Sequence, residues 1–151
     1  LFQIKLNETL REQLGGAYSP SAGGGCARVP KPRYAIQVQF NSSPENVEKL
    51  TKSVFAVIDT LQTKGPSAAD VSKVKEQLIR AHEVEVKQNS FWLGNIMARE
   101  QAGEDVNGLL APYDEMLKNI TAAEIQAAAK RYFNVTHYAR FVLLPETKPT
   151  P

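Results

Sequence analysis

The first fourteen residues carry an apolar side chain at every fourth position. Four residues share this spacing: Phe2, Leu6, Leu10 and Leu14. Such a spacing places them on one stripe of an α-helix. Gly15-Gly16 follows directly, and glycine accepts the left-handed conformation that commonly ends a helix. The sequence therefore predicts a helix over residues 1–14 whose apolar stripe packs against another layer.

Two strand patterns follow this helix. Tyr18–Val29 is small and polar, with Gly23-Gly24-Gly25 inside it, and Arg33–Phe40 alternates apolar and polar side chains. We expect an irregular strand and a half-buried strand, joined as an antiparallel pair by the short turn Pro30-Lys31-Pro32. The glycine run either permits distortion of its strand or lets an extended ligand backbone come close. Glycine alone does not decide between these two roles.

The rest of the chain is predicted to be helical up to a last strand at Tyr138–Leu144. Helix starts are indicated by Ser43-Pro44, by Ser67 with Asp70 and by Thr121 with Glu124. Further helical patterns cover Ser90–Ala102 and Leu109–Leu117. The resulting fold class is α+β, with a mostly antiparallel sheet covered on one face by several helices.

Three strands are fewer than an average sheet contains. We therefore expect residues 1–146 to be part of one domain that lacks its N-terminal portion. Residues 147–151 are expected to form a disordered tail.

Composition excludes several classes of function. A net charge of +2, from 18 basic and 16 acidic residues, argues against binding of nucleic acid or of an anionic membrane surface. No apolar run approaches the roughly 18 residues of a membrane span. Cys26 is the only cysteine, so neither an intramolecular disulfide nor a cysteine-based zinc site is possible. The lack of disulfides is compatible with both cytoplasm and periplasm.

The residues that commonly perform catalysis are scattered along the chain. The two histidines, His82 and His137, are far apart in sequence, and no second histidine stands within a helical turn of either. We expect both to be structural and this chain to hold no metal. Cys26 has no predicted histidine partner, so we expect it to pack as a small residue in its strand.

Arg11 and Tyr18 are the candidates for direct chemistry. A helix, a Gly-Gly corner and a strand can bring the guanidinium and the phenol to one edge of the sheet. Both groups donate hydrogen bonds. If both were aimed at one carbonyl oxygen, they would stabilise the negative charge that develops there when water attacks. From spacing alone, a surface arginine beside a core-edge tyrosine is the commoner arrangement.

Three segments, in this order, resemble the C-terminal half of the pitrilysin/insulinase-type zinc peptidases. Arg11-Glu-Gln-Leu-Gly-Gly-Ala-Tyr18-Ser is similar to the family's "R-E-x-L-G-x-x-Y-S" segment. Asn89-Ser-Phe-Trp-Leu93 with Gly103-Glu-Asp105 is similar to its "N-x-[FY]-W-L … G-E-D" helix pair. Residues 121–134 and 138–146 resemble its closing helix and strand.

The resemblance implies a role within a larger zinc-dependent endopeptidase. Family members build a clam-like chamber from repeated α+β domains, with zinc on an H-x-x-E-H motif of an N-terminal domain. A later domain supplies an arginine and a tyrosine that contact the substrate main chain, and these positions correspond to Arg11 and Tyr18. We expect Gly15, Gly16 and Ser19 to bind substrate beside them. H-x-x-E-H is absent here, so the fragment alone is expected to cleave nothing.

Two other functions stay open. Relatives with this fold also serve as non-catalytic partner or scaffold subunits, and the same surface suits a plain peptide-binding module that adds a substrate strand to a sheet edge. The expected partners are a peptide or unfolded polypeptide and an N-terminal zinc-binding domain or subunit. The resemblance favours the periplasm or cell envelope over the cytoplasm.

Overall fold

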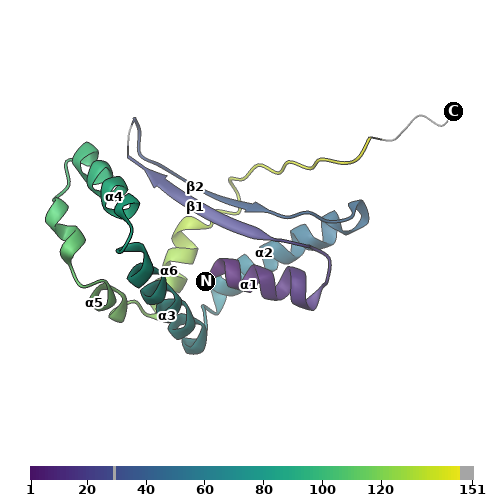
Figure 1. Ribbon diagram of the computed structural model, residues 1–151. Coiled ribbons are helices and arrows are strands. Elements are labelled where there is room, and N and C mark those ends of the chain that lie inside the picture. The colour runs from purple at the N-terminus through teal and green to yellow at the C-terminus, as the bar shows by residue number, and fades with distance from the viewer. Residues whose placement is uncertain (29, 147–151) are drawn as a thin grey trace.

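The computed structural model describes residues 1–28 and 30–146. An antiparallel strand pair lies over a layer of helices, and further helices extend beyond the hairpin turn (Figure 1). This arrangement confirms the predicted α+β class. Val29, at the end of the first predicted strand, and the predicted disordered tail at 147–151 both lie outside the described residues.

The first helix has two parts, α1 (Phe2–Leu6) and a π-helical turn η1 (Asn7–Gln13). The strands are β1 (Ser21–Ala27) and β2 (Arg33–Gln39), paired from Ser21 with Gln39 to Ala27 with Arg33. The remaining elements are η2 (Pro44–Asn46), α2 (Val47–Thr63), α3 (Ala68–Glu85), α4 (Asn89–Ala102), η3 (Val106–Leu110), α5 (Tyr113–Lys118) and α6 (Ala122–Tyr132).

The predicted apolar stripe forms the centre of the core. Leu6 and Leu10 are fully buried against Leu50 of α2, and the half-buried Phe2 and Leu14 pack against the same cluster. Val54, Ile58 and Ala17 complete the buried set. Full burial of one leucine side chain contributes about 1.5–3 kcal/mol. This cluster therefore holds the first helix, the start of β1 and α2 together.

The other end of α2 is joined to α6. Val57 and Leu61 pack against Ala129 there. Two glutamine amides bridge the same contact. Gln62 Nε2 donates to the carbonyl of Phe133 at 2.8 Å, and Gln126 Nε2 donates to the carbonyl of Thr63 at 2.8 Å. Because the last carbonyls of a helix lack intrahelical partners, these amides stabilise both C-terminal ends at once.

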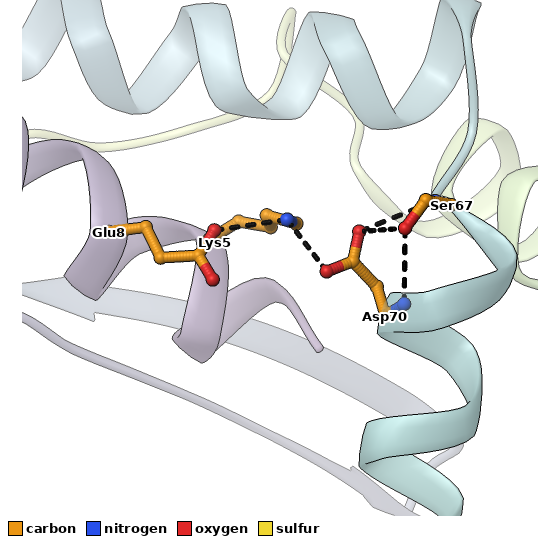
Figure 2. A network of polar contacts seen from close by, with 4 residues as sticks. All are labelled: Lys5, Glu8, Ser67 and Asp70. Carbon is orange, nitrogen blue, oxygen red and sulfur yellow. Dashed lines mark hydrogen bonds and ion pairs between the residues drawn. The ribbon is translucent and has the colours of Figure 1, made fainter.

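Lys5 connects α1 to the start of α3 (Figure 2). Its Nζ lies 2.8 Å from the Asp70 carboxylate and 3.0 Å from that of Glu8. Asp70 also closes the predicted capping box with Ser67. The hydrogen bond to Asp70 raises the pKa of Lys5, and the hydrogen bond from Lys5 lowers the pKa of Asp70.

The prediction of a single helix over Leu109–Leu117 is wrong. The structure has η3 up to Leu110 and then α5 from Tyr113. Pro112 lies between them, and a residue that precedes proline is disfavoured in the helical region. Ala111 accordingly adopts φ −63° and ψ 140°.

The third strand predicted at Tyr138–Leu144 is also wrong. In the described residues the sheet has two strands, and this segment is extended without a ladder partner. Phe141 and Leu143 are 88% and 98% exposed. Arg140 pairs with Glu48, and Tyr138 packs edge-on against Phe55. The apolar composition predicted a buried, paired strand, but pairing requires a neighbouring strand edge that the described residues do not supply.

The ion pair between Lys5 and Asp70 predicts a pH-dependent contribution to stability. Asp70→Asn keeps an oxygen for the capping box but removes the charge, so we expect about 1 kcal/mol lower free energy of unfolding at pH 7. Because the folded-state pKa of Asp70 is below its ordinary 3.8, the contribution is lost as pH falls through the folded value. The folded-state pKa of Lys5 is above its ordinary 10.5, so the contribution of the pair to stability is also lost as pH rises through that folded value. Urea unfolding at several pH values measures the difference.

Asp114→Asn is the matched control, since Asp114 lies 3.9 Å from Lys118 in an exposed pair. It should leave stability unchanged. A deficit of Asp70→Asn that persists undiminished below pH 2 would contradict the assigned pair.

Candidate functional site

The candidate site begins at a widened turn at the end of the first helix. The N–H of Leu14 donates to the carbonyl of Thr9 at 3.1 Å, a span of five residues rather than four. This π-helical turn contains Arg11. Such turns are uncommon and occur frequently at functional sites. The side chain of Arg11 is 58% exposed, so the turn presents the guanidinium to solvent.

Gly15-Gly16 forms the predicted corner, and a different constraint favours glycine at each of the two positions. Gly15 has a φ of 59°, in the left-handed region that favours glycine. A Cβ on Gly16 would lie 3.0 Å from Cδ2 of the fully buried Leu50. The N–H groups of Gly16 and Ala17 both donate to the carbonyl of Leu10, at 3.2 and 3.3 Å. The corner is thus fixed by conformation, by space and by hydrogen bonds.

Tyr18 follows the corner and points away from the core. Ala17 is buried, whereas Tyr18 is 88% exposed. The N–H of Tyr18 donates to the carbonyl of Asn41 at 3.4 Å. Tyr18 was predicted to start the strand, but β1 begins at Ser21. Its backbone is nevertheless tethered to the segment that follows β2.

An open depression of about 720 Å³ lies at this end of the molecule. Its lining residues come from η1, from the segments before β1 and after β2, and from η2. Figure 1 shows the ribbon of these segments at the end of the strand pair opposite the hairpin turn. All five predicted site residues line the depression: Arg11, Gly15, Gly16, Tyr18 and Ser19. Its other wall consists of residues that were not predicted to belong to the site: Asn41, Ser42, Ser43 and Asn46. The sequence pattern that could have indicated these residues is the cluster of short polar side chains around the helix start at Ser43-Pro44.

The two donors of the depression are available to a ligand. Within the described part of the chain, the ion pair of Arg11 is with the neighbouring Glu12, at 3.6 Å and with both side chains exposed. Pairs of this kind contribute little. The described residues provide no hydrogen bond to the Tyr18 hydroxyl. A fork of guanidinium donors and a phenol on one surface suit a carbonyl or carboxylate oxygen.

Gln3 limits where a peptide strand can be added to β1. Its Oε1 accepts from the N–H of Ala22, and its Nε2 donates to the carbonyl of Pro20 at 2.8 Å. One side-chain amide thereby occupies the start of the β1 edge as a neighbouring strand would. Because the direction of the backbone N–H and C=O groups alternates along a strand, those of Gly24 and Cys26 face the same edge as those of Ala22. The described residues supply no second strand at this edge.

The other reactive residues are separate from the depression. His82 stacks on Tyr113 with ring centroids 4.1 Å apart, and His137 belongs to a turn with Asn134 rather than to a strand start. Cys26 is exposed, so the expectation that it packs among small residues is wrong. Residues 1–28 and 30–146 contain no group of three or more His, Cys, Asp or Glu that could hold a metal ion. They also contain no helix long and apolar enough to cross a membrane.

Comparison with known families identifies the fold and its relatives. The sequence model of the family described as "Peptidase M16 inactive domain" matches residues 2–78. The chain belongs to this family. A zinc protease PQQL-like protein of Arabidopsis thaliana is 33% identical over 107 residues, covering 68% of this chain and 11% of the relative. The stromal processing peptidase of Pisum sativum is 26% identical over 133 residues, covering 87% of this chain and 10% of the relative.

Solved structures of M16 proteins share the fold. The periplasmic protease PqqL from Escherichia coli has a TM-score of 0.71 at 20% identity, covering 87% of this chain and 14% of PqqL. An M16 inactive domain from Pseudomonas fluorescens has a TM-score of 0.72 at 18% identity, with 87% and 30% coverage. The ferredoxin protease FusC, solved with Arabidopsis ferredoxin, has a TM-score of 0.69 at 22% identity, with 88% and 14% coverage.

The comparisons confirm the predicted family. The chain is an M16 inactive domain of zinc-protease-like proteins, and it spans about a tenth of the length of the curated relatives that it matches. Their names support hydrolase and zinc peptidase as the class of protein to which such a domain belongs. The roles of Arg11 and Tyr18 stay predictions.

The Gly-Gly corner yields a test of how the M16 domain holds its depression. Gly15→Ala forces a side chain into the left-handed region and should cost about 1–2 kcal/mol. Gly16→Ala overpacks Leu50 and should cost about 1–3 kcal/mol. Gly23→Ala is the matched control, because nothing lies within 4 Å of a Cβ at that position. Chemical denaturation of the three variants measures these costs, and an equal stability of all three would show that the corner is not constrained.

Proposed function

We propose that this chain is the substrate-binding, carbonyl-polarising C-terminal domain of a zinc-dependent endopeptidase. Its substrate is a peptide or an unfolded polypeptide, and the H-x-x-E-H zinc site belongs to another domain or subunit. The observation that carries the proposal is that Arg11 and Tyr18, exposed and available, line one open depression.

The two donors act on the substrate carbonyl in different ways. The guanidinium of Arg11 offers several N–H groups and a full positive charge, and the Tyr18 hydroxyl offers one further donor. Their attraction for the carbonyl oxygen increases as that oxygen becomes negative, so they stabilise the transition state more than the ground state. Gly15 and Gly16 carry no side chain beyond Cα, which lets the main chain of a substrate come close to the corner.

Zinc does not fit the described residues of this chain. A zinc site needs three or four ligands at fixed geometry, and those residues contain no such group. The family description "inactive domain" agrees with this division. In the proposal, the nucleophile is generated at a zinc site of another domain or subunit, and this chain contributes binding and polarisation. The ferredoxin protease FusC, which shares the fold and was solved in complex with ferredoxin, supports a polypeptide ligand.

A non-catalytic role is the alternative. The description "inactive domain" also suits a partner or scaffold subunit, or a peptide-binding module without a zinc partner. An H-x-x-E-H motif in the same polypeptide favours the single-chain peptidase, and one in a neighbouring gene favours a two-subunit peptidase. Absence of the motif from both favours the scaffold.

The compartment proposed is the periplasm or cell envelope. PqqL from Escherichia coli, which shares the fold, is periplasmic. The stromal processing peptidases are chloroplastic, so the domain serves proteins in more than one compartment. Fractionation of the source cells, followed by detection of the chain, tests this assignment.

Arg11→Ala and Tyr18→Phe test the catalytic role in the complete zinc peptidase. Each change removes one donor that acts in the transition state, so we expect kcat to fall by about a hundred- to a thousandfold. Zinc content should stay unchanged, because neither residue belongs to a metal site. Steady-state kinetics on a peptide substrate and metal analysis of the same preparations provide the measurements.

Arg80→Ala and Tyr138→Phe are the matched controls. Both residues are exposed, at 70% for the Arg80 side chain and 63% for Tyr138, and neither lines the depression. They should retain wild-type turnover. Unchanged kcat in both Arg11→Ala and Tyr18→Phe would remove the proposed role.

A further inference from the structure

We propose that Asn46 is a further substrate-contacting residue, whose side-chain oxygen accepts a hydrogen bond from a main-chain N–H of the bound peptide. This inference rests on the proposed function and deepens it. It assigns the opposite wall of the depression to the recognition of the donor half of a peptide unit, while Arg11 and Tyr18 recognise the acceptor half.

Asn46 is the last residue of η2, directly before α2, and its backbone is helical, at φ −91° and ψ −12°. The extended residue that precedes this helical stretch is Ser43. Asn46 Nδ2 donates to Ser43 Oγ at 3.0 Å. The Asn46 side chain therefore lies along η2, in the wall of the depression.

The partner Ser43 fixes which end of the amide is free. Asn46 Nδ2 is the atom that lies 3.0 Å from Ser43 Oγ, so the Ser43 oxygen accepts from the amide nitrogen. Oδ1 is therefore the free end of the amide. Among the described residues, none donates a hydrogen bond to Oδ1.

The depression thus offers complementary groups on its two walls. The Arg11 guanidinium can only donate, the Tyr18 hydroxyl can donate or accept, and Asn46 Oδ1 can only accept. A peptide unit carries both a carbonyl and an N–H, and an N–H that loses its water without a new acceptor costs about 1–3 kcal/mol. A carboxylate ligand has no donor for Oδ1. The pairing of walls therefore favours a peptide main chain over a simple anion.

The experiment combines Asn46→Ala with ester-substituted substrates in the complete zinc peptidase. In a series of peptides, each non-scissile amide near the cleavage site is replaced in turn by an ester, which removes one N–H. With the all-amide peptide we expect Asn46→Ala to lower kcat/KM by about tenfold. With the ester at the contacted position, wild type should already be low and Asn46→Ala should cause no further loss. The amide and ester substrates are compared on the same variant, so a reduced stability of Asn46→Ala does not affect the ratio of the two rates.

Two further variants sharpen the result. Ser43→Ala keeps Oδ1 but releases Nδ2, so it should cause a smaller loss, about threefold, with the same dependence on the ester position. Asn119→Ala, in an exposed residue after α5 that does not line the depression, should match wild type with every substrate.

The outcomes separate this inference from the proposed function. If Arg11→Ala and Tyr18→Phe lower kcat but Asn46→Ala loses activity equally with every ester, or loses none, Asn46 does not accept a substrate N–H and the inference is overturned. If Arg11→Ala and Tyr18→Phe retain full turnover, the proposed function itself fails.

Discussion

The packing of Leu10 against Leu50 is the contact on which both walls of the depression depend. Leu10 is fully buried, and its carbonyl accepts from both Gly16 and Ala17. Leu50 lies one turn after Asn46 and determines how closely the Gly16 backbone can approach. The wall with Arg11 and Tyr18 and the wall with Asn46 are therefore attached to one leucine cluster. A shift at this contact would change the separation of the two walls.

The buried leucine cluster and the exposed side chains of the depression contribute different amounts of free energy to folding. Each fully buried leucine contributes about 1.5–3 kcal/mol, whereas an exposed pair such as Arg11 with Glu12 contributes between about 0 and 1 kcal/mol. The leucine cluster behind the depression is consequently well packed, and the exposed side chains of the depression remain free to exchange water for a ligand. Preorganised donors on a rigid support are what electrostatic stabilisation of a transition state requires.

The sequence predicted those features that local rules determine. The leucine stripe, the Gly-Gly corner, the hairpin and the capping boxes at Ser67 and Thr121 depend on spacing and residue type. The third strand was wrong because an apolar run at Tyr138–Leu144 indicates what should be buried without indicating the edge that buries it. The wall at residues 41–46 was missed for a related reason. Its short polar residues have several local roles, and only the fold shows that they face Arg11 and Tyr18.

The term "inactive domain" is compatible with a chemical role for this chain. The described residues contain no group of three or more His, Cys, Asp or Glu that could hold a metal ion, and such a site concerns the generation of a nucleophile. Stabilising the developing charge needs only positioned donors. If Arg11 and Tyr18 served the fold, burial or strong pairing would be expected of them, and neither holds. Gly15, with its positive φ, and Gly16, packed against Leu50, hold the corner between these two exposed side chains, and the proposed function assigns that exposure to ligand binding.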